Sequence, residues 1–246
     1  MLTVIAILLA LIISLALLVY RWTVTPYGRL TLNSAITARK YALLSCFIDD
    51  DAPITVERRQ RAHSAMIKGQ GKPVSIQRTQ DQAINGPESE LALRLYSPAQ
   101  VDTLPVLLFF HGGGFAYGNL DSHENLCRKL ANHSHHLVVA VDYRLAPENP
   151  FPAAIEDAYA ALLWVAGNIS GLGGDPAQVS VAGESAGGNL AAAVAMMARD
   201  RGGPGIKHQI LLYPMLNADH FDEGTHRDLA TGFMITTKSI VSFWRA

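Results

Sequence analysis

The pentapeptide Gly183-Glu184-Ser185-Ala186-Gly187 is the first place where this chain could do chemistry. It stands between the apolar run Val179–Ala182 and the Ala-rich run Leu190–Arg199. A serine on a tight GxSxG turn from a strand into a helix has a projecting hydroxyl, and the helix N-terminus favours a developing negative charge. Ordinary Gly and Ser usage produces such a pentapeptide in roughly one chain in ten. Its context, more than the pattern, therefore predicts a nucleophile elbow here.

A second motif, His111-Gly112-Gly113-Gly114, directly follows the apolar run Val106–Phe110. A turn of three glycines lets backbone N–H groups point into a pocket that side chains would otherwise block. Together with the N–H after a nucleophilic serine, such amides stabilise the tetrahedral oxyanion of acyl transfer. We interpret this turn as part of an oxyanion hole, with an ordinary glycine-rich turn as the alternative.

The two motifs together resemble those of the hormone-sensitive-lipase-like group of α/β-hydrolases, the family IV or "fold-3" esterases. The match is carried by His111–Phe115 and Gly183–Asn189. Between them, Asp142–Glu148 and Phe151–Ala154 are similar to the family's intervening segment. The resemblance extends from about Leu91 to Tyr213 and implies the α/β-hydrolase fold.

The resemblance implies a serine carboxylic-ester hydrolase that forms an acyl-enzyme with a small acyl ester and uses no metal or organic cofactor. It makes Ser185 the nucleophile and assigns the oxyanion hole to the amides of Gly113, Gly114 and Ala186. His111 is expected to orient the glycine loop. Glu184 is expected in a supporting role, although aspartate is more usual in the family at that position.

The resemblance also implies an ion pair between Arg144 and Glu148 that stabilises their loop, with no catalytic role for either. Two other functions stay open. One is a non-catalytic ligand-binding member of the same fold, because the family includes a hormone receptor. The other is a deacetylase or amidase that acts on small acylated compounds.

The general base is the missing part of this site. A serine nucleophile needs a base and an orienting acid, which follow in α/β-hydrolases in the order Ser, Asp or Glu, then His. After Ser185 the chain holds one convincing strand, Gln209–Tyr213; His208 falls at its wrong end, and His220 and His226 fall in a lid-like stretch. We therefore expect the triad Asp and His, and the last strands of the sheet, to be absent from an incomplete esterase. A complete but inactive member is the alternative.

The elements around these motifs alternate along the chain. Short apolar or alternating runs predict strands at 91–96, 106–110, 137–141, 179–182 and 209–213. Amphipathic or Ala-rich runs predict helices at 56–68, 124–132, 153–165, 190–199 and 237–246. Apolar strands that alternate with helices indicate a mostly parallel sheet with helices on both faces, the α/β class.

The N-terminus predicts a membrane anchor. Leu2–Val19 contains no charge, Gly or Pro, and as a helix it would rise roughly 27 Å, close to the hydrocarbon thickness of a bilayer. Tyr20-Arg21-Trp22 follows as an aromatic and cationic collar. A cleaved signal peptide is the alternative, although no Lys or Arg precedes the apolar run. Basic residues after the segment predict a single-pass anchor with the main domain on the cytoplasmic side.

The predicted organisation is a membrane anchor or signal peptide at 1–22, a helical lid or linker at 23–70 and a truncated hydrolase domain at 71–246. Twenty Lys and Arg against 21 Asp and Glu argue against nucleic-acid binding, because no basic excess is available for phosphates. Cys46 and Cys127 are too few for a disulfide framework. The cluster His133, His135 and His136 has no acidic or Cys ligand nearby, so we predict no metal site.

Overall fold

A computed structural model describes residues 2–25, 28–45, 52–98, 103–231 and 235–246 of the chain. Cys46 lies outside the described residues. The chain divides into two units. The sheet unit comprises Pro53–Ala218 and Phe243–Ala246, and the helical unit comprises Met1–Ala52 and Asp219–Ser242.

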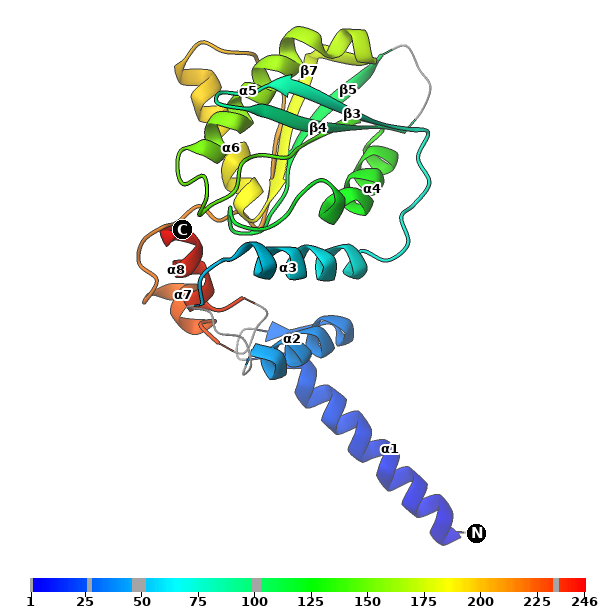
Figure 1. The fold of residues 1–246 in the computed structure, drawn as a ribbon. Coiled ribbons are helices and arrows are strands. Elements are labelled where there is room, and N and C mark those ends of the chain that lie inside the picture. The colour runs from blue at the N-terminus through cyan, green and yellow to red at the C-terminus, as the bar shows by residue number, and fades with distance from the viewer. Residues whose placement is uncertain (1, 26–27, 46–51, 99–102, 232–234) are drawn as a thin grey trace. The chain divides into compact units, whose positions relative to one another are not determined.

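Six strands form the sheet of the sheet unit, in the order β3-β4-β6-β5-β7-β8 (Figure 1). β5, β6, β7 and β8 are parallel to one another, whereas β4 is antiparallel to both of its neighbours, β3 and β6. The strands are β3 (Arg78–Asn85), β4 (Glu90–Ser97), β5 (Leu104–Phe110), β6 (Leu137–Val141), β7 (Gly174–Glu184) and β8 (Gln209–Leu212).

Helices cover both faces of this sheet (Figure 1). Alternate residues of β5 show the division: Val106, Leu108 and Phe110 pack in a cluster with α5 and α6, and Leu107 and Phe109 pack in a second cluster with α4. The helices of the unit are α3 (Val56–Gly69), η1 (Asp121–His123), α4 (Glu124–Ser134), α5 (Ala153–Asn168), η2 (Ile169–Leu172) and α6 (Ala186–Asp200).

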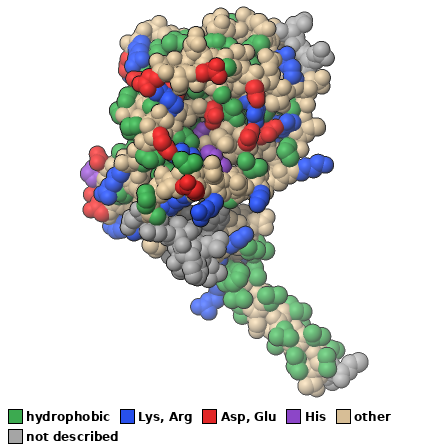
Figure 2. Space-filling view, viewed as in Figure 1, with side chains coloured by type: hydrophobic (Ala, Val, Ile, Leu, Met, Phe, Trp, Pro, Cys, Tyr) green, Lys and Arg blue, Asp and Glu red, His purple; other side chains and the backbone are tan. Residues whose placement is uncertain are grey.

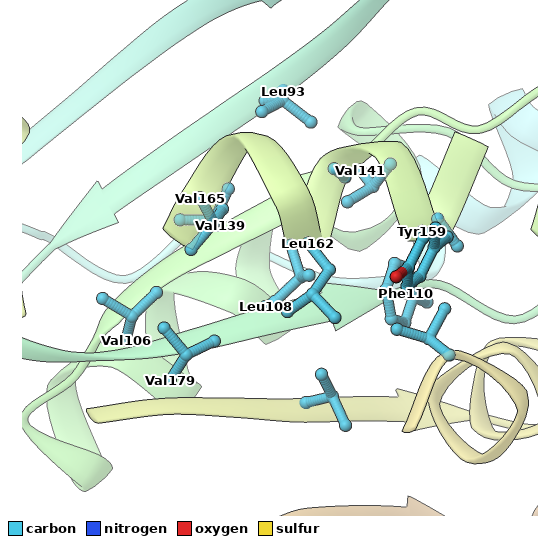
Figure 3. Packing of buried hydrophobic residues seen from close by; sticks show 14 of the residues in the cluster. Leu93, Val106, Leu108, Phe110, Val139, Val141, Tyr159, Leu162, Val165 and Val179 are labelled. Carbon is cyan, nitrogen blue, oxygen red and sulfur yellow. The ribbon is translucent and has the colours of Figure 1, made fainter. Parts of the chain in front are cut away.

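The larger cluster is a dry core between the sheet and α5. Figure 3 shows Leu162 and Val165 of α5 pointing toward Val106 and Leu108 of β5. All four side chains are fully buried. Because the central strands are apolar on both faces, they are fixed between two layers of helix, and the loops at their carboxyl ends are held in constant positions.

The helical unit holds the apolar N-terminal helix α1 (Leu2–Thr23), a two-stranded hairpin of β1 (Val24–Thr25) and β2 (Gly28–Arg29), α2 (Leu32–Ser45) and α7 (Gly224–Asp228). The last helix, α8 (Thr237–Arg245), crosses the boundary between the units. Hydrophobic side chains run along the visible face of α1 (Figure 2). Among the described residues, α1 alone is long and apolar enough to span a membrane, properties that a signal sequence near the N-terminus shares.

The predicted strands and helices are confirmed, with ends shifted by a few residues. β7 differs most, because it begins at Gly174, five residues before the predicted start. No strand is predicted from the sequence at β3, because its run Arg78–Asn85 is mostly polar and largely exposed. The boundaries of the predicted domains stay a prediction.

Candidate active site

Ser185 occupies the turn between β7 and α6. Its backbone has φ 54° and ψ −119°, a conformation that costs a residue other than glycine roughly 1–3 kcal/mol. Backbone hydrogen bonds hold the turn in place: the Ser185 amide donates to Leu212 at 2.9 Å, and the Met215 amide donates to the Ser185 carbonyl at 3.1 Å. The half-buried side chain of Ser185 thus stands on a strained, well-anchored bend at the carboxyl end of the sheet.

Both glycines of the GxSxG pentapeptide are required by close packing. A Cβ on Gly187 would overlap the carbonyl oxygen of Phe110, and a Cβ on Gly183 would overlap that of Gly187. The start of α6 therefore lies directly against the end of β5. This contact brings the serine turn to the first residues of the glycine loop, because Phe110 precedes that loop.

The glycine loop after β5 closes as a turn in which the Tyr117 amide donates to the Gly113 carbonyl at 2.9 Å. Gly113 has φ +126°, which side-chain-bearing residues rarely adopt. Among the described residues, no hydrogen bond is recorded from the amides of Gly113, Gly114 or Ala186. The loop and the first residue of α6 thus present N–H groups that are available to an incoming acceptor.

Glu184 joins the two loops. Its Oε1 accepts a hydrogen bond from the buried Gly112 amide at 2.9 Å and lies 3.0 Å from His123 Nε2. A carboxylate only accepts, so Nε2 of His123 carries the proton of this bond. Burial acts to raise the pKa of Glu184, but the His123 bond and charge, with Tyr213 and the Gly112 amide, outweigh it and hold the pKa below its ordinary value.

His111 directly precedes the three glycines, and its side chain contacts their loop. Its Nδ1 is 2.8 Å from the Gly112 carbonyl, and its ring stacks on Tyr143 at 4.3 Å. The Tyr143 hydroxyl donates to the His111 carbonyl at 2.7 Å. Burial, assisted by repulsion from His123, lowers the pKa of His111 to about 3. A neutral, buried imidazole of this kind supports the loop.

Of the three histidines after Ser185, only His208 belongs to the sheet unit, which contains the serine. His208 precedes β8, and its carbonyl accepts from Val181, four residues before Ser185. His220 and His226 belong to the helical unit. The His220 ring is exposed, with Nδ1 3.7 Å from Glu223. Among the described residues of the sheet unit, the Ser185 hydroxyl has no hydrogen bond to an imidazole.

The predicted ion pair between Arg144 and Glu148 is wrong. Arg144 contacts Asp157 of α5 with three hydrogen bonds of 2.9–3.1 Å from its Nε and Nη2, and also pairs with Glu88. Glu148 instead binds Arg59 of α3 at 2.5 Å. Asp157 is 2% exposed, and a buried carboxylate needs a paired cation. Its ion pair with Arg144 therefore holds the loop that contains Arg144 against α5.

Sequence reasoning also missed polar residues that support the glycine loop. His123, to which no role is assigned from the sequence, binds Glu184. Arg59 and His63, on a helix predicted as lid or linker, contact the loop directly. Their spacing of four residues places them on one helix face, which is the only sequence signal that pointed to a shared partner. Among the described residues, no group of three or more metal-ligating side chains occurs.

Comparison with known proteins identifies this arrangement. Residues 107–246 match a family model described as the alpha/beta hydrolase fold. The chain belongs to the hormone-sensitive-lipase-like α/β-hydrolases. The matched segment contains both the glycine loop and the serine turn.

Relatives of this α/β-hydrolase are named as esterases. Carboxylesterase NlhH of Mycobacterium tuberculosis is 50% identical over 132 residues, which are 53% of this chain and 41% of that protein. Carboxylic ester hydrolase LipN of the same organism is 38% identical over 224 residues, 89% of this chain and 57% of that protein. The chain thus spans about half the length of these curated relatives.

Solved structures agree on the fold. The hyperthermophilic esterase of the archaeon Pyrobaculum calidifontis superposes with a TM-score of 0.74 at 38% identity, covering 85% of this chain and 68% of that one. The predicted fold class, a mostly parallel α/β-hydrolase sheet with helices on both faces, is therefore confirmed.

Proposed function

We propose that this α/β-hydrolase is a serine carboxylic-ester hydrolase in which Ser185 attacks an ester carbonyl and forms an acyl-enzyme. The observation that carries the proposal is the backbone of Ser185, with φ 54° on a bend between strand and helix. Strain of this kind persists only where the surroundings fix it, and it gathers at active sites. The named esterase relatives support the same reaction class.

The amides of Gly113, Gly114 and Ala186 are proposed as the oxyanion hole. Attack by Ser185 Oγ would turn the ester carbonyl oxygen into an oxyanion, and preorganised N–H groups stabilise this charge without reorganising. Two facts support the assignment: the three amides have no recorded partner among the described residues, and Glu184 ties their loops together. Collapse of the tetrahedral intermediate expels the alcohol and leaves the acyl group on Ser185 Oγ.

The proton of Ser185 needs an acceptor. We propose that none of the histidines in residues 1–246 fills this role. Within the sheet unit no described histidine is hydrogen-bonded to the serine, and His208 lies beside Val181, four residues before it along the paired strands. Acylation by residues 1–246 alone should then be slow and hydrolysis of the acyl-enzyme slower still, since both steps use the base. A small acyl ester would accordingly leave its acyl group on the protein.

The test is to incubate the 246-residue chain with p-nitrophenyl butyrate and locate butyryl groups by peptide mass spectrometry. The expected result is one butyryl group on Ser185, formed faster than on any other hydroxyl, with only trace turnover. Ser185→Ala, checked for folding by circular dichroism, should remove that adduct. If no butyryl group is found on Ser185, the proposed acyl-enzyme is overturned. Turnover at about 1 s⁻¹ or faster would overturn the proposed absence of a base.

The same assay separates amide from ester substrates. We expect p-nitroanilide of butyrate to leave no adduct under conditions in which the p-nitrophenyl ester acylates Ser185, because an anilide leaves less readily than a phenolate. Acylation by the anilide at a comparable rate would favour the deacetylase or amidase reading. Saturable binding of an ester analogue without any acylation would favour the ligand-binding reading.

We further propose that α1 anchors the protein in a membrane, with the main domain on the cytoplasmic side. The helix Thr3–Thr23 is 21 residues long and none of its most apolar window is buried. Arg29 lies over the ring of Tyr20, 5.0 Å from guanidinium carbon to ring centroid, which places a basic group beside the aromatic collar. Such a helix in water would expose an apolar surface that a bilayer would cover.

Membrane fractionation tests the anchor. The protein should sediment with membranes and stay there in carbonate wash, and a protease added to sealed right-side-out cells should not cleave it. Release by carbonate contradicts the anchor. A mature N-terminus near Leu17 identifies a signal peptide instead. Cleavage in sealed cells reverses the proposed side.

A further inference from the structure

Helix α3 lies outside the strand–helix alternation, yet two of its polar residues reach the glycine loop. The helix begins at an N-cap, Thr55, whose hydroxyl accepts from the Arg58 amide at 3.2 Å. Arg59 and His63 stand one turn apart and therefore face the same way. Their contacts converge on residues 116–118, just beyond the glycines proposed for the oxyanion hole.

Arg59 bridges two segments of backbone. Its Nε donates to the Ala116 carbonyl and its Nη2 donates to the Ala146 carbonyl, both at 2.8 Å. Nη1 and Nη2 also bind the Glu148 carboxylate at 3.0 and 2.5 Å. With a side chain only 15% exposed, Arg59 fixes the loop through charge-assisted bonds that water competes for poorly.

His63 holds the loop one residue after Tyr117. The Gly118 amide donates to its Nε2 at 2.9 Å. On its other side Gly118 is in contact with His111, because a Cβ there would overlap the His111 ring. Gly118 is thus held between an imidazole beneath the loop and an imidazole from α3.

We propose that Arg59 and His63 are positioning residues for the oxyanion loop: from α3 they hold residues 112–118 so that the amides of Gly113 and Gly114 keep one direction. This inference rests on the proposed function of those amides. The physical reason is entropic, since a loop with three successive glycines has many conformations. Donors stabilise a transition state well only when they are already fixed.

The bond to His63 brings a dependence on pH. Nε2 accepts a hydrogen bond only while it carries no proton, so protonation of His63 would release Gly118. The ionisable groups around the ring are Arg59 on its own helix, His123 from η1 and His111 beneath the loop. Burial first, then the charges of Arg59 and His123, lower the pKa of His63, which keeps the acceptor unprotonated near neutral pH.

The test measures amide hydrogen exchange of the 246-residue chain by mass spectrometry, with peptides that cover 112–119 and β5. Arg59→Ala and His63→Ala should each speed exchange in 112–119 by roughly tenfold or more, the effect of losing a hydrogen bond of ordinary strength, and leave β5 unchanged. Arg61→Ala is the matched control, because Arg61 is exposed on the same helix. It should exchange like the wild type.

Two conservative variants separate positioning from bulk structure. His63→Gln keeps an oxygen acceptor that does not titrate, so the loop of this variant should exchange as slowly as that of the wild type near neutral pH. At low pH the wild-type loop should exchange faster because His63 is protonated, and the variant should not show this increase once the rates are corrected for intrinsic exchange. Arg59→Lys keeps the charge but loses the fork that reaches both carbonyls, so its loop should exchange as fast as in Arg59→Ala. If Arg59→Ala and His63→Ala speed exchange in β5 as well as in the loop, or in neither segment, the positioning role is overturned.

Acylation of Ser185 by p-nitrophenyl butyrate, measured in the same variants, keeps the two proposals distinct. If the loop loosens and acylation slows together, both proposals stand. Acylation of Ser185 that is unchanged while the loop loosens overturns the link to the oxyanion hole. An absence of Ser185 acylation in the wild type overturns the proposed function, and the exchange data then still decide whether α3 orders the loop.

Discussion

The Glu184 carboxylate accepts a hydrogen bond from the Gly112 amide at 2.9 Å, and this bond links the serine turn to the glycine loop. Glu184 is the last residue of β7, and Gly112 follows the end of the neighbouring parallel strand β5 by two residues, since β5 pairs with β7 up to Phe110 and Gly183. The acid before the serine therefore acts in the structure as a tie between loops. His123, at 3.0 Å from the same oxygen, holds the carboxylate in place.

Replacing Glu184 should show how much this tie stabilises the fold. In Glu184→Ala the buried Gly112 amide and His123 lose their acceptor, so the free energy of unfolding should fall by about 1–3 kcal/mol. Glu184→Gln keeps an amide oxygen and should lose less. Urea unfolding measures the difference. Glu156→Ala, at an exposed position of α5, is the control and should stay within about 0.5 kcal/mol of wild type. Equal losses in Glu184→Ala and the control would contradict the tie.

A second prediction concerns the contact between α6 and β5. Gly187→Ala puts a methyl group onto the Phe110 carbonyl, so the helix must shift, and the free energy of unfolding should fall by roughly 1–3 kcal/mol. Gly167→Ala is the matched substitution in α5, where nothing lies within 4 Å of the added carbon. It should stabilise the protein by about 0.5–1 kcal/mol. Thermal or urea unfolding of the two variants measures these changes. If both variants raise, or both lower, the free energy of unfolding, the packing argument is wrong.

The third prediction compares two ion pairs. Arg144→Ala leaves the carboxylate of Asp157 buried without its partner, which should cost about 3–5 kcal/mol. Arg199→Ala removes a pair whose side chains are 70% and 58% exposed, and the free energy of unfolding should change by less than about 1 kcal/mol. Chemical denaturation of both variants measures the contrast. A loss below 1 kcal/mol in Arg144→Ala would show that Asp157 finds another partner or a proton.

The elements that were predicted best from the sequence are those with a clear pattern of apolar residues. The run Leu137–Val141 is apolar at every position because both faces of β6 are buried, and the structure has the strand at these residues. β3 was missed for the opposite reason. It lies at the edge of the sheet with most of its side chains exposed, so Arg78–Asn85 carries no apolar pattern.

Polar partners were beyond the reach of sequence patterns. The resemblance implied a local pair between Arg144 and Glu148, yet Glu148 binds a residue 89 positions away and Arg144 binds one 13 positions away. Likewise, the Gly118 amide binds His63, 55 positions earlier. Which charged residues form an ion pair depends on burial and on distances in the folded structure, and neither follows from the spacing of residues along a loop.

The last prediction concerns Asp142, which follows β6. Burial first, then repulsion by Asp121, raise the pKa of Asp142 to about 6, against the attraction of Arg94 and a bond from the Leu120 amide. A carboxyl with a raised pKa binds more protons in the folded than in the unfolded state. Its stabilising contribution is therefore complete below its unfolded pKa of 3.8 and is lost as the pH rises through about 6.

Asp142→Asn removes this titration and keeps an oxygen for the Leu120 amide. Relative to wild type the variant should gain stability as the pH rises, by at most about 1.4 kcal/mol for each pH unit and about 2 kcal/mol in total between pH 4 and 6, and the difference should level off above about pH 7. Urea unfolding between pH 4 and 8 measures it. His111, whose pKa of about 3 gives the opposite slope, is present in both proteins and cancels. Asp222→Asn, at an exposed position, is the control and should show no such change. A gap between Asp142→Asn and wild type that does not vary with pH would mean that the Asp142 carboxyl is ionised throughout, with Arg94 outweighing its burial.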